Sequence, residues 1–167
     1  MRLVATGGGT GGHVYPALSI LTALRGRLAE KGLVGLDVLY VGSSGGLEEG
    51  IVKRAGLAFN TTPSGAVIGR SPLTVMANLG RTLAGVVASR RIIKRYRPRV
   101  VLATGGYVTV PVVLAARLTG VPSLIYLPDV VPGLAVRFLA RFADRVAVTF
   151  AETRRHLPAG KAVTTGY

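Results

Sequence analysis

The chain has 167 residues, of which 49% are hydrophobic and 17% are charged, and it contains no cysteine. This length and apolar content fit one folded domain and argue against disorder, and the lack of cysteine excludes disulfides, cysteine metal sites and cysteine nucleophiles. The formal net charge is +14, and no acidic residue occurs between Glu49 and Asp129. We therefore expect a positive field over the middle of the domain and a polyanionic partner: nucleic acid, anionic lipid or a phosphorylated substrate.

Apolar runs alternate with amphipathic stretches along the chain, which is typical of βαβ units and a parallel sheet. The pattern predicts strands at 2–6, 36–42, 57–62, 99–103, 122–127 and 144–149, and helices at 14–31, 46–55, 72–97, 109–119 and 132–141. The predicted fold class is α/β: a Rossmann-like open parallel sheet with helices on both faces, in one domain over residues 1–167. A short strand precedes Thr164 without a closing helix, so we expect the chain to be cut at a linker.

A glycine-rich loop, Gly7-Gly8-Gly9-Thr10-Gly11-Gly12-His13, lies directly after the first predicted strand and before a helix. Glycines let the backbone approach an oxyanion, and the helix amino terminus supplies N–H groups, so the loop is typical of a phosphate site. The second strand lacks the acidic residue of a dinucleotide site, and no Gly-Lys-Ser/Thr of a phosphate-binding P-loop follows. The alternative is a tight turn that binds no ligand.

His13 stands at the end of this loop, where a neutral imidazole could act as general base. The alternative is that it only caps the helix or contacts phosphate. Glu48 and Glu49 fall in the first turn of the helix at 46–55, where their charge favours the helix dipole, and we interpret them as structural.

The helix at 72–97 carries Leu73, Met76, Leu79 and Leu83 at helical spacing, with Arg81 and a basic run nearby. This pattern is typical of a membrane-surface helix attracted to anionic lipid. It equally fits a helix that packs these residues in the core and exposes a basic face. Nucleic acid is disfavoured, because tyrosines are not interleaved with the basic run as stacking platforms. No run of about 18 apolar residues occurs, so membrane contact would be peripheral.

A second glycine loop, Thr104-Gly105-Gly106-Tyr107, follows the apolar strand near 100–103. In an open α/β sheet, ligands bind beyond the carboxyl ends of the strands, where both loops and Asp129 fall. Two such loops side by side could bind a diphosphate, and Asp129 could bind hydroxyls or assist His13. The alternatives are an ordinary turn, with Thr104 and Tyr107 capping the next helix, and a turn role for Asp129 after Pro128.

These motifs resemble glycosyltransferase family 28, the bacterial transferases that add N-acetylglucosamine to the lipid-linked muramyl pentapeptide. The resemblance rests on Gly8–Ala17, on Gly46-Leu47-Glu48, and on Gly105-Gly106-Tyr107-Val108 followed by Pro111. It implies the amino-terminal, acceptor-binding and membrane-facing half of a two-domain GT-B enzyme, whose donor-binding carboxyl-terminal domain is absent from this chain. One stretch departs from the family, because Tyr126-Leu127-Pro128-Asp129 stands where the family usually has His-Glu-Gln-Asn.

The resemblance also implies the site and the reaction. Substrate diphosphates would lie at Thr10, Gly11 and Gly12, with Gly105, Gly106 and Tyr107 in the second loop. His13 would be the base for inverting transfer from UDP-N-acetylglucosamine to a lipid diphosphate-linked muramyl acceptor, with no cofactor and no metal, at the cytoplasmic membrane face. The isolated domain is expected to be inactive. Alternatives are a family 28 relative with another acceptor, and a non-catalytic membrane-recruiting subunit that works with a separate donor-binding chain.

Overall fold

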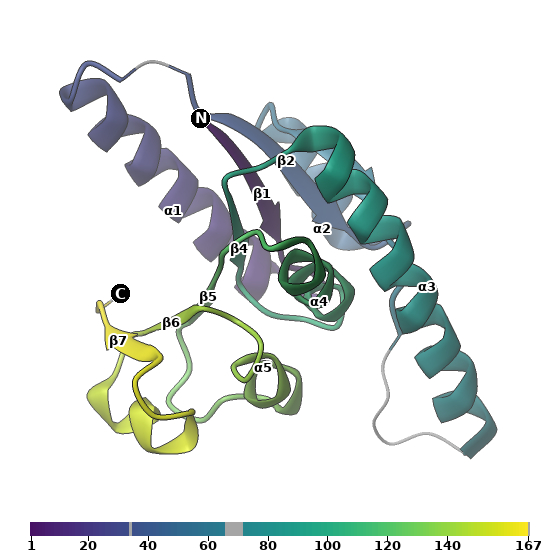
Figure 1. The fold of residues 1–167 in the computed structure, drawn as a ribbon. Helices are drawn as coiled ribbons and strands as arrows, with labels where there is room; N and C mark the ends of the chain where they lie inside the picture. Colours follow the sequence, from purple (N-terminus) through teal and green to yellow (C-terminus); the bar gives the residue numbers. More distant parts are fainter. Residues whose placement is uncertain (34, 66–71, 167) are drawn as a thin grey trace.

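A computed structural model describes residues 1–33, 35–65 and 72–166, so that Tyr167, the end of the predicted domain, lies outside them. Within these ranges the strands form one parallel sheet in the order β3-β2-β1-β4-β5-β6-β7 (Figure 1). The strands are β1 (Arg2–Thr6), β2 (Asp37–Gly42), β3 (Ala58–Thr61), β4 (Val100–Ala103), β5 (Ser123–Leu127), β6 (Arg145–Val148) and β7 (Ala162–Thr164). The predicted α/β class with a parallel sheet is confirmed.

Helices cover both faces of the sheet (Figure 1). On one face α1 (Gly11–Glu30) and α2 (Leu47–Arg54) pack on strand residues such as Leu3, Ala5 and Tyr40. The opposite face carries α3 (Pro72–Tyr96), α4 (Thr109–Thr119) and α5 (Leu134–Leu139), which pack on Val4, Val101 and their neighbours. A short 3-10 helix, η1 (Ala151–His156), was not predicted. The central strand β4 is buried because helices cover it on both sides.

The predicted strands agree with the observed ones to within one residue, but two helices differ. α1 begins at Gly11 instead of residue 14, because only Thr10 has the extended conformation of a cap, with φ −147° and ψ 157°. Gly11 and Gly12 therefore belong to the first helical turn. α5 begins at Leu134 rather than 132, because Gly133 before it is extended, with φ −61° and ψ 159°.

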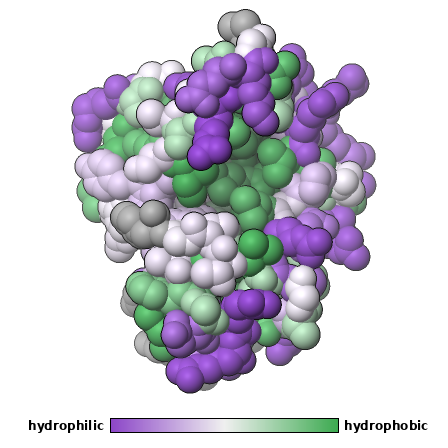
Figure 2. Space-filling model, turned by 90° about the vertical axis from the view of Figure 1, so that its left-hand side faces the viewer, coloured by the Kyte–Doolittle hydropathy of each residue, from purple (hydrophilic) through white to green (hydrophobic). Residues whose placement is uncertain are grey.

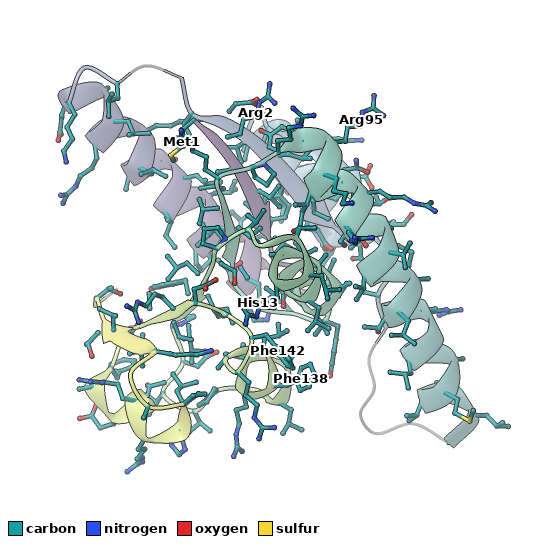
Figure 3. The ribbon with its side chains drawn as sticks, in the orientation of Figure 1. Met1, Arg2, His13, Arg95, Phe138 and Phe142 are labelled. Carbon is teal, nitrogen blue, oxygen red and sulfur yellow. The ribbon has the colours of Figure 1, made fainter. Side chains whose placement is uncertain are left out.

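The order of the strands places the two glycine loops next to each other. β1 pairs with β2 on one side and with β4 on the other, so the chain leaves β1 and β4 in opposite directions. This reversal opens a crevice at the carboxyl ends of β1 and β4, where α/β sheets bind ligands. His13 lies at this end of the sheet, whereas Met1, Arg2 and Arg95 lie at the other end (Figure 3).

The side of the molecule that carries α1 and the last strands is hollowed at its centre, where hydrophobic residues gather (Figure 2). A cavity of about 410 Å³ lies there between α1, β5 and β6, with Ile20, Leu124, Tyr126 and Ala147 in its lining. These residues belong to the face of the sheet that α1 covers only in part. The hollow is separate from the crevice between the glycine loops.

Candidate active site

The two glycine loops contact each other through their backbones. The amide of Gly8 donates a hydrogen bond to the carbonyl oxygen of Gly105 at 3.2 Å. Gly106 has φ +85°, and a Cβ added there would overlap the carbonyl oxygen of Gly8. This conformation and this close approach both require glycine. The loops therefore form one continuous backbone surface at the carboxyl ends of β1 and β4.

His13 is held against the second loop by a reciprocal pair of hydrogen bonds. Its Nδ1 lies 3.1 Å from the carbonyl oxygen of Thr104, and the Thr104 hydroxyl donates to the His13 carbonyl oxygen at 2.6 Å. A carbonyl oxygen can only accept, so Nδ1 carries the proton and Nε2 of the neutral ring keeps its lone pair. A Cβ on Gly105 would come within 2.6 Å of Nδ1, so glycine is also required beside the ring.

A small cleft of about 180 Å³ opens at this point. It brings together His13, Gly106, Tyr107 and Asp129, four of the residues that the sequence placed in the site. The remaining walls come from the end of β5 and from the start of α5, and Tyr107 and Asp129 are exposed to solvent. The same cleft is thus lined by an imidazole, a carboxylate-bearing residue and a tyrosine, which suits the binding of a ligand rich in hydroxyls.

The other predicted site residues lie at the edge of this cleft. Thr10 and Gly12 are exposed at the amino terminus of α1, and Gly11 is partly exposed. The first turn of α1 contains no acidic residue, and its first amides have no partner within the helix. These groups can bind an anion. Gly105 is buried behind His13 and supports the ring instead of facing the cleft.

Glu48 stabilises the first glycine loop through hydrogen bonds. This role is more specific than the favourable interaction with the helix dipole that we expected from its position. Its side chain is fully buried and accepts hydrogen bonds from the Gly9 amide at 3.4 Å, the Ser43 amide at 2.9 Å and the Ser43 hydroxyl. Burial raises the pKa of this carboxyl, but the hydrogen bonds from Ser43 and Gly9 outweigh burial and lower the pKa below its ordinary value. The sequence signal for this role was Gly46-Leu47-Glu48.

Tyr40 stabilises the same loop from β2. Its hydroxyl donates to the carbonyl oxygen of Gly7 at 2.8 Å, and its ring is fully buried. Burial, with a smaller contribution from the Glu48 charge, raises the pKa of Tyr40 far above its ordinary value. The hydroxyl therefore stays protonated and available as a donor. Sequence reasoning had assigned Tyr40 no role at the loop.

From Asn78 to Ser89, α3 packs with its polar side inward. Asn78, Thr82 and Ser89 are buried, and the Thr62 hydroxyl contacts the Ser89 hydroxyl at 2.9 Å and donates to the Gly85 carbonyl oxygen at 3.0 Å. The predicted apolar residues are on the outside. These residues are Leu73, Met76, Leu79 and Leu83. The interpretation that they pack in the core is therefore wrong, because hydroxyls and a glycine give α3 its closest approach to the segment around Thr62.

Among residues 1–33, 35–65 and 72–166, no three histidine, aspartate or glutamate side chains are grouped so that they could hold a metal ion. In the same part of the chain, no helix is both long enough and apolar enough to cross a membrane.

Comparison with known proteins identifies the family. Residues 3–148 match the model of the glycosyltransferase family 28 N-terminal domain. The chain belongs to glycosyltransferase family 28. The family resemblance expected from the glycine loops is thereby confirmed.

Similar family 28 proteins come from several bacteria. One from Roseiflexus sp. (strain RS-1) is 48% identical over 94% of this chain, and one from Desulforudis audaxviator (strain MP104C) is 47% identical over 99%. Both are named UDP-N-acetylglucosamine--N-acetylmuramyl-(pentapeptide) pyrophosphoryl-undecaprenol N-acetylglucosamine transferase. The chain covers only 39% and 43% of their lengths, so this family 28 domain spans less than half of these relatives.

Solved structures place the domain in the same architecture. The MurG structure from Acinetobacter baumannii superposes with a TM-score of 0.78 at 30% identity, over 97% of this chain and 44% of that one. A UDP-GlcNAc 2-epimerase from Neisseria meningitidis superposes with a TM-score of 0.65 at 11% identity, over 99% of this chain and 46% of that one. The second likeness shows the Rossmann-like fold alone.

Proposed function

We propose that this family 28 domain is the acceptor-side half of a glycosyltransferase. The full enzyme would transfer N-acetylglucosamine from UDP-N-acetylglucosamine to a muramyl pentapeptide linked through diphosphate to a polyprenyl lipid. The observation that carries this proposal is the cleft in which His13, with its Nε2 lone pair free, adjoins the two glycine loops. The names of its relatives support the choice of donor and acceptor.

His13 would act as the general base. The acceptor hydroxyl oxygen attacks the anomeric carbon of the donor sugar while the bond from that carbon to the UDP oxygen breaks. The hydroxyl proton passes to Nε2 of His13, and the configuration at the anomeric carbon inverts. The hydrogen bond from Nδ1 to Thr104 orients the ring for this transfer and stabilises the imidazolium that forms.

The glycine loops would bind the diphosphates of donor and acceptor. The amides of Thr10, Gly11 and Gly12 lie at the amino terminus of α1, where the helix dipole favours negative charge. Gly106 and Tyr107 extend the same surface into the cleft. Fixed backbone donors of this kind stabilise developing charge on a leaving diphosphate, because they need no reorganisation during the reaction.

The outward face of α3 would contact the cytoplasmic surface of the membrane. Leu73 and Met76 are 81% and 73% exposed, and Leu79 continues the apolar stripe. Arg81 is exposed on the same helix and would interact with anionic headgroups. An apolar stripe beside basic residues is typical of helices that lie on a bilayer surface. Contact of this kind would bring the cleft close to a lipid-linked acceptor.

Two alternative functions can be distinguished from this proposal by experiment. Asp129 lines the cleft and belongs to the stretch that departs from the family pattern. This departure favours a family 28 transferase that uses a different acceptor. The second alternative is a non-catalytic subunit that recruits a separate donor-binding chain to the membrane. In both, the glycine loops would still bind a diphosphate.

The test is transfer of labelled N-acetylglucosamine from its UDP donor by the full-length protein that contains this domain. We expect product on the lipid-linked muramyl pentapeptide and none on the same pentapeptide lacking diphosphate and lipid. Product on a different lipid-linked acceptor only would replace the muramyl assignment. Donor binding without transfer to any acceptor would contradict the enzymatic proposal.

A further inference from the structure

An apolar groove runs from the cleft along the outer helices. It measures about 450 Å³, within the roughly 300–1,000 Å³ of small-molecule sites. α3 supplies Leu79 and Leu83 to its walls, and α4 supplies Leu114. α5 closes the groove with Leu134 and Phe138. Among the lining residues that the structure describes, only Tyr107 and Thr82 carry a polar side-chain atom, and none is charged.

The groove has few polar groups that could form hydrogen bonds with a polar ligand. The Thr82 hydroxyl already donates to the Asn78 carbonyl oxygen at 2.9 Å within α3. Tyr107 stands at the junction with the cleft, whose lining it shares with the groove. The Phe138 ring packs against Phe142 with centroids 5.1 Å apart, which holds the α5 wall in place. The groove thus suits an apolar occupant.

The cleft and the groove share Tyr107, Leu134 and Ala135, so they lie side by side. A ligand whose diphosphate lies against the glycine loops would therefore have its next atoms at the mouth of the groove. In the acceptor named for the relatives, those atoms begin a polyprenyl chain.

We propose that the groove binds the first isoprene units of the acceptor lipid, an inference that rests on the proposed function. The occupant is one chain rather than the bilayer, because the groove adjoins the cleft in which the diphosphate of that chain would lie. Leu73 and Met76 do not line the groove and remain available for bilayer contact. Chain binding and membrane contact thus share Leu79 but otherwise use different residues of α3.

The test compares the binding of methyl diphosphate and geranyl diphosphate to the full-length protein by isothermal titration calorimetry, without vesicles. Geranyl diphosphate is expected to bind at least about tenfold more tightly, since even one methylene in an apolar pocket gives discrimination of that order. Leu83→Gln and Leu134→Gln should each reduce this ratio several-fold. The matched control is Leu118→Gln, because Leu118 is 64% exposed against 60% for Leu83 and does not line the groove.

The outcomes separate this inference from the proposed function. Equal affinity for the two diphosphates, or a ratio that neither groove variant changes, would overturn the groove while leaving the diphosphate site intact. Failure of both diphosphates to bind would overturn the diphosphate site and the groove with it. Thermal unfolding of each variant checks that a lower ratio does not come from a loss of fold.

Discussion

The nitrogen of His13 that can accept a proton is decided by a carbonyl group 91 residues away in the sequence. Thr104 accepts from Nδ1 and returns a hydrogen bond to the His13 backbone, so the ring and the second loop hold each other. Gly105 keeps space free beside the ring. A base oriented in this way needs no further reorganisation before it receives a proton.

His13→Ala in the full-length protein should lower kcat by roughly 10²- to 10⁴-fold, the usual contribution of a positioned general base. The measurement is initial-rate transfer of labelled sugar at saturating donor. His156→Ala is the matched control, because His156 is the other histidine of the chain and does not line the cleft. Near-normal turnover of the His13 variant would remove the base assignment.

Glu48→Gln should destabilise the domain by about 1–3 kcal/mol at neutral pH, because Gly9 and Ser43 would lose an ionised acceptor inside the protein. The folded-state pKa of Glu48 lies below its ordinary value of 4.5. The wild-type advantage should therefore be complete above that value and disappear as the pH falls through the lower, folded pKa.

Urea unfolding of the wild type and the Glu48 variant between neutral and acidic pH measures this dependence. Glu49→Gln is the control, since the Glu49 carboxylate only forms an exposed 2.7 Å ion pair with Lys53. Its loss should cost no more than about 0.5 kcal/mol. A difference between wild type and Glu48→Gln that stays constant with pH would show that the charge of Glu48 does not support the loop.

α3 is the element whose packing departs most from a simple amphipathic helix. Its inward side is small and polar at Asn78, Thr82 and Ser89 and becomes apolar at Ile93, while Leu73, Met76 and Leu79 face solvent. Gly85 makes the closest approach, because a Cβ there would overlap the carbonyl oxygen of Pro63. Shape and hydroxyl contacts therefore position this helix, which leaves its apolar stripe available for another surface.

Two glycines of α3 provide a matched test of this packing. Gly85→Ala should destabilise the domain by about 1–3 kcal/mol, because the added methyl group forces the segment around Pro63 away. Gly80→Ala has nothing within 4 Å of the added Cβ and should stabilise the helix by up to about 1 kcal/mol. Denaturant unfolding distinguishes the two, and equal effects of the two changes would contradict this packing.

The double variant Leu73→Gln with Met76→Gln should bind anionic phospholipid vesicles at least about tenfold more weakly, since burying each such side chain contributes roughly 1.5–3 kcal/mol. Vesicle sedimentation measures the partition. Thermal stability should change little, because both side chains are exposed. Leu33→Gln is the control, as Leu33 is 57% exposed and lies beyond the carboxyl end of α1. Undiminished vesicle binding by the double variant would exclude this face of α3.

At the scale of the whole molecule, two features matter: the net charge of the chain and the fraction of the relatives' length that it covers. The charge of +14 favours contact with an anionic surface, and the chain matches less than half of the relatives' length. Under the proposed function, a second domain would supply the donor site and complete the enzyme.

The 167-residue chain alone should therefore give no detectable transfer, whereas the full-length protein should be active on the lipid-linked acceptor. The assay is release of labelled lipid product at equal molar concentrations of the two proteins. Addition of a separately produced carboxyl-terminal domain tests whether the halves can act as two chains. Full activity of the short chain would contradict the assignment of this domain to the acceptor side only.

The sequence by itself determined the alternation of strands and helices, the two glycine loops and the family, because these depend on local periodicity and on adjacent residues. It also placed His13, Gly106, Tyr107 and Asp129 at one edge of the sheet, since all follow the carboxyl ends of parallel strands. Tertiary structure alone decided the hydrogen bond between His13 and Thr104, the burial of Glu48 and the outward apolar face of α3. Each depends on contacts between residues that are distant in sequence. A local sequence pattern specifies neither the partner of such a residue nor its burial.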